Sequence, residues 1–118
     1  MSDRPDDKPG CDPEEHGQAP NARFADADVS RAVRLFRALA DEARLRTLEL
    51  LAEGELCVSE IAEASEEDTS TVSHRLRLLH QEHLVDRRRQ GRHVMYSLAD
   101  DHVIALVRNA LEHVSHEH

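Results

Sequence analysis

Aromatic residues are almost absent from this chain of 118 residues, which has one tyrosine, two phenylalanines and no tryptophan. Cysteine is as scarce, and two cysteines exclude the disulfide-dense scaffold of small secreted proteins. No apolar run reaches the ~18 residues that a membrane span needs, and the charged N-terminus does not resemble a signal peptide. We therefore expect a cytoplasmic protein without membrane contact, in which Cys11 and Cys57 are thiols.

The apolar residues that are present are mostly leucine, valine and alanine, which favour helices. A chain of this length has room for one domain with a modest core. Small cores of this kind often gain stability from a second copy. We therefore expect a mainly α-helical homodimer.

Charge is distributed unevenly along the chain, whose net charge is −9. Residues 1–28 hold eight acidic and three basic residues and few large apolar ones, which predicts a disordered acidic N-terminal arm before a domain over 29–118. Residues 70–93, in contrast, hold six arginines against two acidic residues. A local basic patch decides DNA binding more than the total charge does, so nucleic acid is not excluded.

Apolar spacing predicts four helices, then two strands, then a last helix. Aspartates stand where three of the helices should begin, at Asp41, at Asp68 (with Thr69 as the alternative cap) and at Asp100. A turn at Gly91 should join the strands into a hairpin. The expected order is α-α-α-α-β-β-α, over residues 29–39, 42–53, 58–64, 70–82, 84–90, 93–98 and 101–116.

The fourth predicted helix has two distinct faces. Val72, Leu76 and Leu79 fall on one side at 100° per residue and should be buried. The opposite side carries groups that can hydrogen-bond to base edges and phosphates: Ser70, Ser73, His74, Arg77 and Gln81. A short helix, a turn and this helix make a helix-turn-helix.

The hairpin that follows would be a wing that reaches the DNA backbone through Arg87, Arg88, Arg89 and Arg92. We predict binding to double-stranded operator DNA.

Four segments of the chain resemble the ArsR/SmtB metal-sensing repressors. They are Leu39-Ala40-Asp41-Glu42-Ala43-Arg44-Leu45-Arg46, Glu55-Leu56-Cys57-Val58, Val72-Ser73-His74-Arg75-Leu76 and Gln90-Gly91-Arg92-His93-Val94-Met95-Tyr96. The resemblance covers about residues 30–117. It implies a winged-helix homodimer that represses metal efflux or sequestration genes. It also implies release from DNA when the dimer binds Zn(II) or a similar ion such as Co(II), Cd(II) or Pb(II).

The last predicted helix carries the pattern D-x-H-x10-H-x2-H, which resembles the zinc-type sites of that family. His102 and His113 are 11 residues apart, which places them within about 20° on one face but ~16 Å apart along the axis. One ion with ligand bonds of ~2 Å cannot join them within a chain. Two antiparallel copies of the helix solve this. The predicted interchain site, suited to Zn(II) or Co(II), consists of Asp100, His102, His113 and His116.

The resemblance also implies a second, thiolate site. Family members of this type use a cysteine at the position of Cys57 with ligands from the N-terminal arm, here Cys11 and His16, and Glu60 lies one turn on. Such a set would bind Zn(II), Cd(II) or Pb(II). Ser59 stands where the strongest thiolate pattern has another cysteine. The alternative is that Cys57 is a small buried residue.

Three other functions compete with metal-dependent repression. The first is a thiol-based redox-responsive repressor that uses Cys11 and Cys57. The second is a metal buffer with a histidine-rich tail, which leaves the arginine hairpin unexplained. The third is a zinc hydrolase, but the chain has no H-E-x-x-H motif and no general base beside an open metal position. We therefore expect that the protein is not an enzyme.

Overall fold

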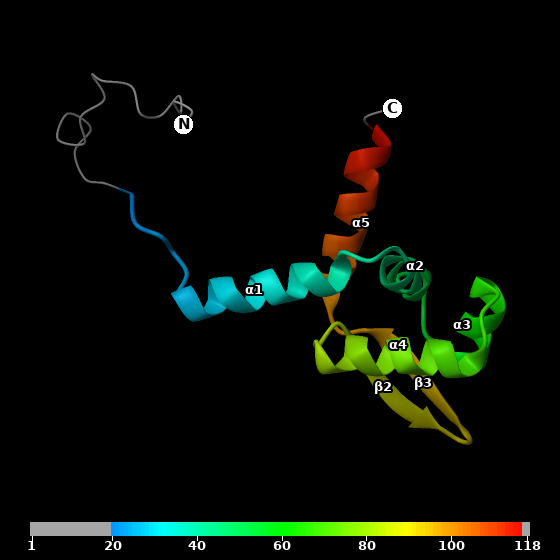
Figure 1. Ribbon diagram of the computed structural model, residues 1–118. Coiled ribbons are helices and arrows are strands. Elements are labelled where there is room, and N and C mark those ends of the chain that lie inside the picture. Colours follow the sequence, from blue (N-terminus) through cyan, green and yellow to red (C-terminus); the bar gives the residue numbers. More distant parts are fainter. Residues whose placement is uncertain (1–19, 117–118) are drawn as a thin grey trace.

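The computed structural model describes residues 20–116 (Figure 1). Two helices lead into a helix-turn-helix, then a hairpin, then a last helix. This is the mainly α winged helix-turn-helix that the sequence predicts. The elements are α1 (Asp26–Leu39), α2 (Glu42–Leu51), β1 (Leu56–Cys57), α3 (Val58–Ser65), α4 (Thr69–Gln81), β2 (Val85–Gln90), β3 (His93–Leu98) and α5 (Asp101–His116).

The sheet is small and antiparallel, with β3 in the middle of the order β1-β3-β2. Strands β2 and β3 form the wing, in which Gln90 pairs with His93 across a turn where Gly91 has a φ of 62°. Strand β1 was not predicted, because two residues are too few to show an alternation of apolar and polar side chains. It adds one more pairing to β3, with Leu56 opposite Tyr96.

The predicted N-terminal caps of three helices are confirmed. The carboxylates of Asp41, Asp68 and Asp100 accept hydrogen bonds from backbone N–H groups three residues on, at 2.9, 2.7 and 2.9 Å. Each of these bonds satisfies a donor that the first turn of a helix leaves unpaired. The predicted boundaries differ by a few residues elsewhere. Helix α1 begins at Asp26 rather than at 29, and α2 ends at Leu51 rather than at 53.

The core lies where α2, α3 and α4 meet the sheet and α5. Leu48 of α2, Ile61 of α3 and Leu76 of α4 are completely buried, and Val107 of α5 is almost so. Helix α1 contributes one buried side chain, Ala38 near its end, and otherwise projects from the body of the molecule (Figure 1). The wing and α5 extend in opposite directions from the core (Figure 1).

No helix within residues 20–116 combines the length and the apolar content that crossing a membrane requires.

Candidate functional site

Helix α4 has the two faces that its spacing predicts. Val72, Leu76 and Leu79 are fully buried, which anchors the helix against the core. Of the residues predicted to face DNA, Ser73 is half-buried and the other four are exposed: Ser70, His74, Arg77 and Gln81. The outer face of α4 therefore offers hydroxyl, imidazole, guanidinium and amide groups to a partner.

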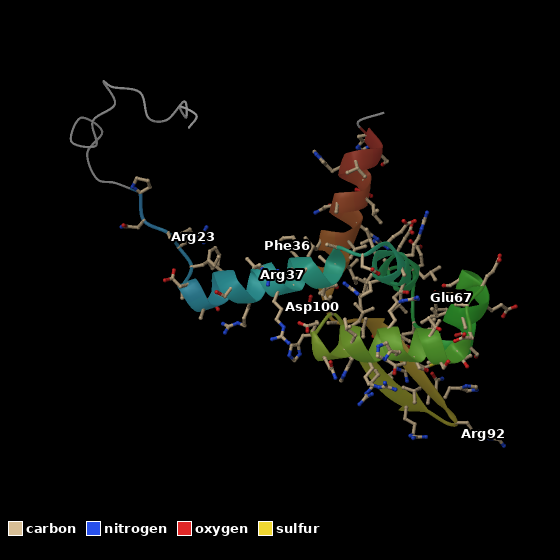
Figure 2. All side chains as sticks on the ribbon, viewed as in Figure 1. Arg23, Phe36, Arg37, Glu67, Arg92 and Asp100 are labelled. Atoms are coloured by element: carbon tan, nitrogen blue, oxygen red, sulfur yellow. The ribbon has the colours of Figure 1, made fainter. Side chains whose placement is uncertain are left out.

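The wing extends this polar surface beyond α4. Arg87, Arg89 and Arg92 are exposed, and Figure 2 labels Arg92 at the far end of the hairpin. Arg88 is also exposed, but it forms two hydrogen bonds, of 2.8 and 2.6 Å, to the carboxylate of Glu55. The hydrogen bonds to Glu55 and its negative charge raise the pKa of Arg88. The same hydrogen bonds and the positive charge of Arg88 lower the pKa of Glu55. Glu55 therefore already compensates the positive charge of Arg88, so this charge is less available to a phosphate group than that of an unpaired arginine.

One arginine of the basic window, which is residues 70–93, does not face outward. The Arg75 side chain lies 10% exposed between α4 and α2, and its guanidinium pairs with Glu67. Sequence spacing alone gave no sign of this contact, since both partners are charged and could equally have been solvated.

The four predicted ligands on α5 lie at its two ends. Asp100 precedes the helix and His102 stands in its first turn, whereas His113 and His116 stand in its last turns. All four residues are exposed, His102 almost completely at 99% of its side chain. Nδ1 of His102 is 3.8 Å from Oδ1 of Asp100, so these two groups lie together. Within residues 20–116 of the single chain, no three metal-binding side chains are brought together.

The surroundings of Cys57 are more compact. Its thiol is buried, and its Sγ lies 3.2 Å from Oγ of Ser59. The predicted ligand Glu60 accepts a 2.9 Å hydrogen bond from the backbone N–H of Cys57, and this bond lowers the pKa of Glu60. The carboxylate thus stabilises the start of α3 as it stands. Cys11 and His16, the other members of the predicted thiolate set, lie outside the described residues.

A stripe of apolar side chains on α1 is open to solvent. Val29, Val33 and Phe36 follow one another at helical spacing and are 53, 43 and 56% exposed. Val114 near the end of α5 is similarly exposed, at 54%. Contiguous exposed apolar surface of this kind marks an interaction site in a soluble protein.

Helix α1 is also tied to the end of α4. The guanidinium of Arg34 donates two hydrogen bonds, of 2.8 and 3.1 Å, to the carboxylate of Glu82, the residue that follows α4. The next residue, His83, has a φ of 62°, and its N–H donates to the carbonyl of His80 at 3.0 Å. The C-terminal end of α4 is therefore held both by its own turn and by α1.

Comparison with known proteins points to one family. A family model described as "Bacterial regulatory protein, arsR family" matches residues 41–87. The transcriptional repressor SmtB homolog of Synechocystis sp. is 51% identical over 67% of this chain and 60% of its own length. The cadmium resistance transcriptional regulatory protein CadC homolog of Staphylococcus aureus is 43% identical over 68% of this chain and 67% of its own length.

Solved structures agree with the sequence relatives. The homodimeric winged helix-turn-helix DNA-binding domain from Mycobacterium bovis, solved by NMR, superimposes with a TM-score of 0.72. It is 34% identical to this chain and covers 86% of this chain and 93% of its own. The identities, the matched helix-turn-helix and the shared fold lead to one conclusion: this chain belongs to the arsR family of bacterial regulatory proteins.

Proposed function

We propose that this protein is a dimeric transcriptional repressor that binds operator DNA and releases it on binding Zn(II) or a similar divalent ion. The observation that carries the proposal is the division of the molecule into two polar surfaces. The outer face of α4 and the wing form one, and the exposed ligands at the two ends of α5 form the other. The first suits DNA, the second suits a metal ion shared between chains.

DNA recognition would use α4 as the recognition helix. Its exposed side chains Ser70, His74 and Arg77 would enter the major groove, where a guanidinium pairs with guanine. The wing would follow the backbone, with Arg87, Arg89 and Arg92 close to phosphates. Binding of this kind is strongest at low salt, because each phosphate contact releases a counterion.

The exposed apolar stripe of α1 would form a dimer interface together with α5. Val33 and Phe36 expose large apolar side chains on α1, and Val114 does so on α5. Removing this apolar surface from water favours association, and part of that gain offsets the freedom that the two chains lose. A two-fold symmetric contact also matches the paired half-sites that helix-turn-helix dimers read. The homodimeric state of the M. bovis domain supports dimerisation.

The α5 residues fit a zinc-type ion in their chemistry. Three imidazoles and one carboxylate are a donor set that suits tetrahedral Zn(II) or Co(II). Oδ1 of Asp100 accepts the capping hydrogen bond from Val103, and the carboxylate would keep lone pairs for the ion. His113 and His116 would come from the antiparallel α5 of the partner, which removes the problem of their distance from His102.

The coupling between metal and DNA would act through the arrangement of the two protomers. Recognition helices must lie ~34 Å apart to enter successive major grooves. An ion that clamps the two α5 helices would favour one arrangement, and the Arg34–Glu82 pair would carry a shift of α1 to the end of α4. If the clamped arrangement has the wrong spacing, DNA affinity falls, and by linkage DNA weakens metal binding by the same factor.

The thiolate set at Cys57 would be a second metal site or a redox site. Its buried thiol and the capping role of Glu60 favour a site that does not control DNA release. We therefore assign regulation to α5.

The experiment is a fluorescence anisotropy titration with operator DNA selected from a random library. We expect specific binding without metal, a dimer mass in sedimentation, and at least about tenfold weaker binding with Zn(II), which corresponds to ~1.4 kcal/mol of coupling. Unchanged affinity with Zn(II) would contradict metal-dependent release, and a monomer would contradict the shared site.

A further inference from the structure

Arg75 lies in the recognition helix but its side chain turns away from the DNA-facing surface. One guanidinium nitrogen donates to Oε1 of Glu67 at 2.8 Å and to Oγ1 of Thr47 at 3.1 Å. The other donates to Oε2 of Glu67 at 2.5 Å. Arg75 is the more buried member of this ion pair, because 10% of its side chain is exposed against 29% for Glu67. Hydrogen bonding of this two-pronged kind fixes direction as well as distance.

The contact joins three parts of the helix-turn-helix region. Arg75 belongs to α4, Glu67 to the turn between α3 and α4, and Thr47 to α2. Thr47 is 1% exposed, and its hydroxyl donates to the carbonyl of Ala43 at 3.0 Å while it accepts from Arg75. Within residues 20–116, every buried side-chain nitrogen or oxygen has a partner. A fully satisfied polar network of this kind specifies one arrangement of the elements that it joins.

Fixing the rotation of α4 matters for reading bases. Side chains project about 6 Å from a helix axis, so a rotation of only about 10° displaces their tips by ~1 Å. Hydrogen bonds tolerate a range of roughly 0.5 Å between donor and acceptor. The apolar stripe of Val72, Leu76 and Leu79 anchors α4 against the core, and the bidentate hydrogen bond adds a directional constraint that apolar contacts lack. A contact that fixes the rotation of α4 would therefore also fix the angle at which His74 and Arg77 face outward.

We propose that Arg75 and Glu67 are a positioning pair for DNA recognition, and that Arg75 does not itself contact DNA. This rests on the proposed binding to operator DNA. It separates Arg75 from the other arginines of the basic window, which the proposed function assigns to bases and phosphates.

The test uses Glu67→Gln, for which the two roles of Arg75 predict opposite changes. If Arg75 contacted DNA, the substitution would free its guanidinium and remove a negative charge, so affinity would rise. As a positioning pair, the same substitution lowers operator affinity about fivefold to tenfold and changes binding to non-specific DNA less than about twofold. Arg75→Gln has a similar effect, and the double variant is no weaker than either single one, because both remove the same interaction.

Glu49→Gln is the matched control. It removes one negative charge from an exposed pair with Arg46 on α2, 3.0 Å long, and should leave operator affinity within about twofold of wild type. Thermal unfolding of each variant establishes that binding is measured on folded protein. Should a glutamine variant fail to fold, Arg75→Lys keeps the charge but loses the two-pronged contact, and it should still lower operator affinity selectively.

Higher or unchanged operator affinity in Glu67→Gln, or wild-type affinity in Arg75→Lys, would overturn the positioning role. So would a fall in salt dependence by one phosphate contact in Arg75→Gln, because that is the signature of direct contact. A wild-type protein that prefers no DNA sequence would overturn the proposed function itself, which is a different result.

Discussion

Mixed dimers test the shared metal site by complementation. Let one chain carry Asp100→Ala with His102→Ala, and another carry His113→Ala with His116→Ala. Eleven residues at 1.5 Å each separate His102 from His113 by ~16 Å along α5, whereas two ligand atoms on one tetrahedral ion lie only ~3.3 Å apart. Each homodimer then has two half-sites, and neither can be completed from within.

Mixing the two chains through a denaturation and refolding step changes this outcome. About half of the dimers are then heterodimers, each with one complete site and one site without ligands. We expect about one tightly held ion for each heterodimer and affinities at least about 100-fold lower for each homodimer, because even outer partners of metal ligands are worth tenfold to 100-fold. The assay is Co(II) titration, in which tetrahedral Co(II) is recognised by its visible absorption, followed by Zn(II) competition.

Two results would refute the reasoning. If the mixture binds no more metal than its two components, the site is not shared between chains. If either homodimer alone binds metal as tightly as wild type, the substituted residues are not the ligands.

Further predictions concern DNA contacts and acid stability. Arg77→Ala should weaken operator binding by about 1–3 kcal/mol and relax base preference at one position, measured by anisotropy with single-base variants; uniform affinity across those variants would contradict a base contact. Arg92→Ala should reduce the salt dependence of binding by about one phosphate contact, and Arg88→Ala by less, because Glu55 already compensates that charge; equal slopes would contradict this. Hydrogen bonds from Arg75 lower the pKa of Glu67 below its ordinary 4.5. The stability gained from that pairing is full above the unfolded-state pKa and is lost as pH falls through the folded one. The difference in urea midpoint between wild type and Glu67→Gln should therefore shrink below about pH 4.5, and a constant difference would contradict the ion pair.

Local signals were enough to predict most of the fold. Asp41, Asp68 and Asp100 mark helix starts because a side chain must satisfy N–H groups that the first turn leaves unpaired. The alternation through the second wing strand predicts His93–Leu98 as the structure has it. Strand β1 was not predicted because its assignment depends on pairing with β3, in which Leu56 lies opposite a residue far along the sequence, Tyr96.

In the candidate site, too, local features could be predicted from the sequence and long-range contacts could not. The outer face of α4 follows from helical periodicity, so its exposed polar residues could be predicted. The inward turn of Arg75 depends on Thr47, 28 residues away, and the compensation of Arg88 depends on Glu55, 33 residues away. Such partners follow only from the tertiary fold. The α5 ligand set came from a resemblance to the zinc-type sites of the family and from the spacing of its residues, and because it needs a second chain it stays a prediction.

Operator affinity with and without Zn(II), in His113→Ala and Cys57→Ser, tests the central claim most directly. His113 would place its metal-bound ring in the clamp, and a ligating histidine donates its other N–H to a nearby acceptor. We predict that His113→Ala binds DNA as wild type does without metal and loses zinc-induced release. Cys57→Ser should keep that release. If Cys57→Ser loses the zinc response and His113→Ala keeps it, the regulatory site lies at Cys57 and the account is contradicted.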